Sequence, residues 1–208
     1  MSISLKTMKI LKLLCASVFV SGSLGTVAGA ESDEIISVGI DGLDFTYPSS
    51  RWERQSGVFT NKGTGNTMPE IKVKASGMDR FVVGFAAKVV AGSDEGTHFG
   101  VYCDFEDGRT IQLYSWTNRF NLLETEAGKE LRHITVGTYK EKISVGENAD
   151  FTAFSIEMKD GDGEVYRDGQ KVGAWKFKPG AASQFRFYVW GGEVAIKEIE
   201  VKIPAAKK

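Results

Sequence analysis

Cysteine and histidine are scarce in this chain, and their scarcity excludes several classes of protein. The 208 residues contain two cysteines and two histidines. Cys15 lies in an N-terminal segment that we expect to be removed, so only Cys103 remains and no intrachain disulfide can form. His98 and His133 belong to no spaced set of ligands, and Cys103 is predicted to face the core, so the sequence offers no zinc triad. The G-x-S-x-G motif of serine hydrolases is also absent from the sequence.

An excess of positive charge and a helical periodicity are missing as well. Once the first 30 residues are set aside, 23 basic and 27 acidic residues give a net charge of −4. A mildly acidic chain without basic runs argues against nucleic acid as a partner. The sequence has no heptads, internal repeats or long linkers, so its length predicts a single domain.

The first 30 residues have the order of a secretory signal peptide. Three lysines accompany the apolar run "ILKLLCASVFV", and small residues follow, with Ala28 and Ala30 spaced as in an A-x-A cleavage site. The run is shorter than the ~20 residues of a membrane span. Leu14 stands where a small residue normally precedes a lipidated cysteine, so a lipid anchor at Cys15 is not favoured. We therefore expect cleavage before Glu31 and no membrane span.

These features define the expected organisation of the chain. A signal peptide covers residues 1–30, a single β-sandwich domain covers 31–203, and a disordered tail covers 204–208. The protein is expected to be secreted or periplasmic. An exported domain without disulfides suggests a bacterial source.

Alternation of apolar and polar residues dominates the chain after residue 31. Turns such as "EDGR", "KDGDGE" and "RDGQ" separate the alternating segments. Many short strands with such turns predict an all-β fold, a two-sheet antiparallel jelly-roll sandwich. The predicted strands are 35–40, 57–62, 70–76, 80–91, 98–106, 109–116, 119–124, 132–139, 151–159, 164–168, 172–177, 184–190 and 193–203.

Two local signals are sharper than the rest. In "EVYRDGQKVGAWKF", Asp168 and Gly169 separate two alternating runs, which predicts a two-residue β-hairpin turn. In the last strand the apolar residues before Lys197 and those after Glu198 have opposite parity. A regular strand would send half of them into water, so a β-bulge is expected there.

The last third of the chain resembles a known family of folds. The segments "FTAFSIEMKDG", "GEVYRDGQKVG", "FRFYVWGG" and "VAIKEIEVK" look like the C-terminal half of concanavalin A-like jelly rolls. Laminin-G-like lectin modules and sugar-active domains of the 3-keto-disaccharide hydrolase type share this pattern, commonly with Asn-Gly where Asp168-Gly169 stands here. The resemblance implies a jelly roll whose concave sheet face is the usual place for a ligand. Its motifs are structural, so it says little about activity.

Parity separates core from solvent in three of the predicted strands. The predicted core sets are Phe99, Val101, Cys103 and Phe105; Ile111 and Leu113; and Phe185, Phe187 and Val189. The opposite sets are His98, Tyr102, Asp104 and Glu106; Gln112, Tyr114 and Trp116; and Arg186, Tyr188 and Trp190.

The opposite sets have the composition of a glycan-binding face. Aromatic rings stack on the apolar face of a pyranose, and carboxylates, arginine and amides bond to its hydroxyl groups. The alternative is a half-buried surface, because tyrosine and tryptophan also favour strands for their packing. We expect His98 to make hydrogen bonds at the end of this face.

Asp104 and Glu106 are the candidate catalytic pair. At positions i and i+2 their Cβ atoms lie roughly 7 Å apart on one face. Their carboxyl groups could approach the ~5–5.5 Å separation of retaining glycosidases. Glucanases of the related fold resemble a pattern of Glu, Asp and Glu along one strand, and here Tyr102 replaces the first acid.

Calcium is the cofactor to consider, and the sequence assigns no metal site. "DGDGE" (160–164) alternates like an EF-hand loop, but Val165 stands where glycine is required, so a turn is favoured. Ser93, Asp94 and Glu95 in "GSDEG" offer further oxygen ligands.

Three functions remain open. The first is a secreted, lectin-like carbohydrate-binding domain whose partner is a glycan or polysaccharide. The second is a small glycoside hydrolase or lyase that uses carboxylates on the same face. The third is an adhesion module with a protein partner, which a large exposed apolar patch would favour.

Overall fold

The described part of the chain consists of β-strands joined by turns and loops. A computed structural model describes residues 35–40, 43–62, 70–93, 96–177 and 180–202. The predicted signal peptide, the predicted tail, Asp94 and Glu95 lie outside these residues. Among the described residues, no helix is long and apolar enough to cross a membrane.

Fifteen strands run through the described residues. They are β1 (Ile35–Ile40), β2 (Leu43–Pro48), β3 (Trp52–Gln55), β4 (Val58–Asn61), β5 (Glu70–Met78), β6 (Phe81–Ala91), β7 (His98–Phe105), β8 (Arg109–Ser115), β9 (Arg119–Glu126), β10 (Lys129–Thr138), β11 (Thr152–Lys159), β12 (Asp162–Arg167), β13 (Gln170–Lys176), β14 (Ala182–Trp190) and β15 (Glu193–Lys202).

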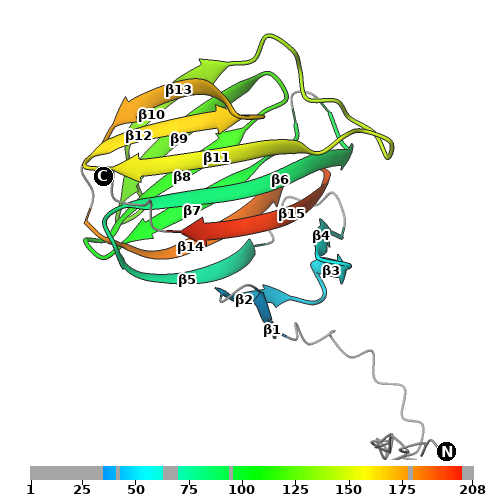
Figure 1. Ribbon diagram of the computed structural model, residues 1–208, viewed down its shortest axis with the longest axis horizontal. Coiled ribbons are helices and arrows are strands. Elements are labelled where there is room, and N and C mark those ends of the chain that lie inside the picture. Colours follow the sequence, from blue (N-terminus) through cyan, green and yellow to red (C-terminus); the bar gives the residue numbers. More distant parts are fainter. Residues whose placement is uncertain (1–34, 41–42, 63–69, 94–95, 178–179, 203–208) are drawn as a thin grey trace, which may run out of the picture. The chain divides into compact units, whose positions relative to one another are not determined.

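The strands form two antiparallel sheets that pack face to face (Figure 1). The eight-stranded sheet has the order β1-β2-β5-β14-β7-β8-β9-β10, and the seven-stranded sheet has the order β13-β12-β11-β6-β15-β4-β3. The predicted all-β sandwich of two antiparallel sheets is therefore confirmed. The last two strands lie inside their sheets, because β14 pairs with β5 and β7, and β15 pairs with β4 and β6.

Alternation directs one face of each strand into the space between the sheets. All nine residues that parity assigned to the core are at most 4% exposed. Rings from the two sheets meet there, since Phe81 of β6 lies 4.9 Å from Phe185 of β14 between ring centroids. Phe85 and Phe187 make a second edge-to-face contact at 5.5 Å. Burial of this apolar surface is the main stabilising contribution to the fold.

The predicted hairpin and the predicted bulge are both present. Asp168 and Gly169 join β12 to β13 with φ values of 48° and 76°, the left-handed pair that a two-residue turn of this type requires. In β15 the register with β6 shifts between Lys197 and Glu200, and Glu198 has φ 53°. The shift lets Ile199 and Val201 pack against the core although their parity differs from that of Ile196. The turn interpretation of "DGDGE" holds for Asp160 and Gly161, which join β11 to β12, whereas Asp162 and Glu164 already belong to β12.

At one side of the sandwich, an edge strand of one sheet contacts an edge strand of the other. β10 and β13 are edge strands of different sheets and lie against each other. A Cβ atom at Gly137 would lie 2.3 Å from the Val172 carbonyl oxygen, and one at Gly173 would lie 2.3 Å from the Val136 carbonyl oxygen. Glycine at both positions therefore permits the two backbones to approach closely.

Two strands were not predicted. β2 alternates Leu43, Phe45 and Tyr47, so its signal was present in the sequence. β3 has a buried Trp52 followed by three exposed residues, and it shows no alternation. It forms because Ser56 and Gly57, both with positive φ, turn the chain back onto β4.

Candidate functional site

The three strands with predicted site residues are neighbours in the eight-stranded sheet. β7 lies between β14 and β8, and the register places Arg186 beside Tyr102 and Tyr102 beside Gln112. The outward side chains of β7, β8 and β14 thus lie on one surface, which the parity of each separate strand could not show. We call the outer surface of this sheet, from β5 to β10, the aromatic face.

A row of three rings crosses the end of the aromatic face. His98 lies between the two tryptophans, with centroids 4.9 Å from Trp116 and 6.1 Å from Trp190. The planes are inclined by 33° and 29°, so the rings are close to parallel. The guanidinium group of Arg119 lies 5.1 Å from the Trp116 ring and covers it further.

Two nitrogen atoms in this ring row have no hydrogen-bond partner among the described residues. They are Nδ1 of His98 and Nε1 of Trp116, and both are buried. Burial lowers the pKa of His98 to about 4, so its imidazole is neutral at pH 7. Unsatisfied buried polar atoms are uncommon in folded proteins, and the described residues contain four others outside this row.

A layer of tyrosines lies beside the ring row. Tyr188 of β14 is 0% exposed although its parity is that of the outer face. It accepts a hydrogen bond from Nε2 of Gln112 at 2.5 Å, two strands away on β8. The strand between them contributes Gly100 at this level, opposite Tyr188 and Tyr114, so no β7 side chain blocks the ring. Tyr188 is therefore part of the floor of the face.

Tyr114 extends the floor in the other direction. Its side chain is 7% exposed, and its hydroxyl lies 2.7 Å from Nε2 of His133 on β10. β9 lies between β8 and β10, so this contact also reaches over a strand. Gln112, Tyr114 and Tyr188 are thus buried supports for the half-buried groups around them.

Charged groups gather at the other end of the aromatic face. Arg186 donates to both oxygens of Asp104, at 2.6 and 2.9 Å, and to Oε1 of Glu70 at 2.5 Å. Its guanidinium carbon lies 4.3 Å from the centre of the Tyr102 ring. Burial opposes the charged form of Arg186, but hydrogen bonds to Asp104 and the charge of Glu70 raise its pKa overall. Burial raises the pKa of Tyr102 to about 12, so its hydroxyl keeps its proton at neutral pH.

The two candidate catalytic acids have different surroundings. Asp104 is bound by Arg186 and also accepts a hydrogen bond from the Thr110 hydroxyl at 3.0 Å. Glu106 is exposed and lies beyond the end of β7, where its backbone N–H donates to Ala181. Asp104 is thus held in a hydrogen-bond network, whereas the Glu106 side chain faces solvent.

The acidic loop considered for calcium has local ion pairs. Asp160 pairs with Arg80 at 2.8 Å, and Glu164 pairs with Lys171 at 2.5 Å. Within the described ranges, no group of three or more His, Cys, Asp or Glu side chains could hold a metal ion.

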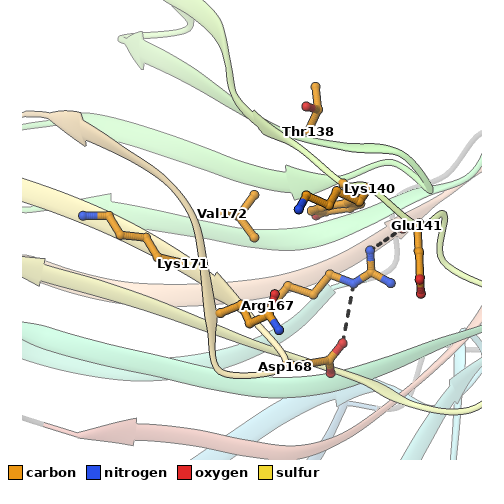
Figure 2. Close-up of a pocket in the computed structure, with 9 residues that line it drawn as sticks. Thr138, Lys140, Glu141, Arg167, Asp168, Lys171 and Val172 are labelled. Atoms are coloured by element: carbon orange, nitrogen blue, oxygen red, sulfur yellow. Dashed lines mark hydrogen bonds and ion pairs between the residues drawn. The ribbon is translucent and has the colours of Figure 1, made fainter.

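A cavity of about 370 Å³ adjoins the β12–β13 hairpin and the end of β10. Figure 2 shows Arg167 inside it, bound to the Glu141 carbonyl at 2.6 Å and paired with Asp168 at 3.6 Å. The same guanidinium lies 4.6 Å from the Tyr139 ring. Among the described residues one aromatic ring lines this cavity, whereas the aromatic face has several, so the aromatic face is the stronger candidate.

Three accessible residues of the face were not predicted from the sequence. Glu70 opens β5, opposite Tyr188, while Leu123 of β9 and His133 of β10 continue the row from Gln112. Each has outward parity in its own strand, but only the strand order shows that they join the site.

Comparisons with known proteins agree on the fold. No model of a protein family matches the sequence, and no curated protein matches it. A solved structure of carbohydrate-binding module CBM66 from Bacillus subtilis is similar at 16% identity and a TM-score of 0.58, covering 76% of this chain and 94% of that one. A putative glycosyl hydrolase from Parabacteroides distasonis is 15% identical with a TM-score of 0.51, covering 74% and 83%. Galectin LEC-6 from Caenorhabditis elegans is 10% identical with a TM-score of 0.50, covering 70% and 96%.

At these identities the likeness defines the fold. The chain is an all-β jelly-roll sandwich of the concanavalin A-like type, as the sequence resemblance implied. Proteins described as a carbohydrate-binding module and as a galectin share this fold.

Proposed function

We propose that this protein is a secreted or periplasmic, lectin-like domain that binds a glycan on the aromatic face. The observation that carries the proposal is the convergence of β14, β7 and β8, which gathers half-buried rings and charged hydrogen-bonding groups on one surface. The partner would be a glycan or polysaccharide, since rings meet its C–H faces and polar groups meet its hydroxyls.

Two details support binding at the ring row. The rings of His98, Trp116 and Trp190 are half-buried, so the exposed part of the row can stack on the C–H face of a sugar. His98 is neutral at pH 7, so a sugar can stack on its ring without desolvating a charge.

The geometry favours binding over catalysis. Asp104 is engaged by Arg186 and Thr110, and Glu106 stands in an exposed turn beyond the strand. In this proposal Asp104, Arg186 and Glu70 form a network that directs hydrogen bonds to the hydroxyl groups of a bound glycan. None of these three side chains transfers a proton.

A glycan array tests the proposal. The protein would be purified from an exporting host and applied with calcium and again with EDTA, and bound glycans would then be incubated overnight and assayed for released sugar. We expect binding without release, unaffected by EDTA, and weaker binding when both Trp116 and Trp190 are changed to alanine. If no glycan binds in any condition, the proposal is overturned in favour of a protein partner. If sugar is released and Glu106→Gln abolishes that release, the protein is instead a hydrolase or lyase.

A further inference from the structure

A continuous row of residues crosses the aromatic face at right angles to the strands. Pairing places Lys72 of β5 beside Arg186, then Tyr102, then Gln112, then Leu123 and finally His133 of β10. The part from β14 to β10 spans four strand spacings of about 4.8 Å, or roughly 19 Å. We call this part the cross-strand row.

The residues of the cross-strand row differ in exposure, and the His133 end is the most exposed. Gln112 is 9% exposed because its amide is turned to the hydroxyl of Tyr188. On one side Tyr102 is half-buried beneath the guanidinium of Arg186. On the other side Leu123 is half-buried and His133 is exposed. The row therefore offers hydrogen-bonding groups at both ends and ring or aliphatic surface between them.

His133 is held in place although it is exposed. Its Nε2 lies 2.7 Å from the Tyr114 hydroxyl, and the Tyr114 side chain is itself buried. The rings of His133 and Tyr114 have centroids 6.2 Å apart. A fixed imidazole loses less conformational freedom on binding than a mobile side chain, so it suits a ligand contact.

We propose that the face takes an extended oligosaccharide, which lies along the cross-strand row from Arg186 to His133 with one edge against the ring row, so that several sugar units bind instead of a single terminal one. This inference rests on the proposed function and adds a ligand class, the interior of a linear polysaccharide. It also assigns contacts to Leu123, beneath a sugar ring, and to His133, at a hydroxyl group of a distal unit.

Affinity measured against chain length tests this inference. Isothermal titration calorimetry would use cello-, laminari- and malto-oligosaccharides of two to six units, with the series chosen by the array. We expect affinity to rise with each unit until the row is filled. His133→Ala should lower affinity for the longest member by about five- to tenfold, the worth of one net hydrogen bond, and leave the disaccharide unaffected.

Matched variants separate ligand contact from folding. Lys129→Ala changes an exposed residue of the same strand outside the row and should leave all affinities unchanged. His133→Gln keeps a hydrogen-bonding group and should recover part of the loss. Equal affinity for short and long oligosaccharides, or an equal effect of His133→Ala on both, would overturn the extended ligand and leave the glycan-binding function standing. Absence of any glycan bound by the unaltered protein would overturn both.

Discussion

His98 occupies an unusual place for an ionisable side chain. It lies on a central strand between two tryptophans, and its ring also contacts the rings of Tyr114 and Tyr188. A charged imidazole would lose hydration there, which is why burial lowers its pKa to about 4. The same aromatic surroundings that hold the ring in place therefore keep it uncharged.

The first prediction concerns the titration of His98. In the unfolded chain a histidine titrates near pH 6.5, so between pH 6.5 and 4 the unfolded state binds the extra proton and the native state does not. The contribution of His98 to stability is thus complete above pH 6.5 and decreases as the pH falls towards 4. NMR titration of the imidazole should give a midpoint near pH 4, and denaturant unfolding should show His98→Gln approaching the unaltered protein in stability as the pH falls. A midpoint near 6.5 would contradict the buried position.

Residue parity was predictable because the strand period is two. The nine predicted core residues are all buried, and the outward sets do face away from the core. Parity could not show that Tyr188 reaches over Gly100 to Gln112, because that contact depends on the order and register of three strands. In the sequence, the buried side chains of the outer face, such as Tyr188 and Gln112, therefore could not be distinguished from the half-buried ones beside them.

At the scale of single elements, β15 offers the clearest test. Deletion of Glu198 would remove the extra residue of the bulge and turn Ile199 and Val201 away from the core. Since burial of an aliphatic side chain is worth about 1.5–3 kcal/mol, we expect a loss of about 2–4 kcal/mol in unfolding free energy, measured with denaturant. Glu198→Gly keeps the residue and suits its positive φ, so it should stay within about 1 kcal/mol of the unaltered protein. A deletion as stable as the glycine variant would exclude this role for the bulge.

Most elements with alternation were found from the sequence; β2 was missed although it alternates, and β3 was missed because it does not. The Asp-Gly turn and the parity change in β15 gave correct local geometry because each has a direct physical cause. β3 has one buried residue in four, so its pairing with β4 leaves no periodic pattern. Glu70, Leu123 and His133 were missed for a related reason, since neighbours across a sheet are not neighbours in the chain.

Thiol chemistry tests the molecule as a whole. Cys103 is buried between the sheets, and burial raises its pKa, so it should not react with a thiol reagent in the native protein. After denaturation the exported protein should show one reactive thiol per chain, because removal of the signal peptide takes Cys15 with it. Two thiols would contradict cleavage before Glu31. Reducing agent should leave the melting temperature unchanged, since a single cysteine forms no internal disulfide.

The positions of β14 and β15 have a consequence for synthesis of the chain. Each of these last strands lies between strands made much earlier, so neither sheet can be completed until residues 182–202 have left the ribosome. Pairing between such distant segments is slow, because the loop-closure entropy is lost before the contacts form. The nascent sandwich therefore stays open until β14 and β15 are available for pairing. Truncation within the last two strands would remove the centre of the sandwich, whereas most proteins tolerate the loss of a peripheral end.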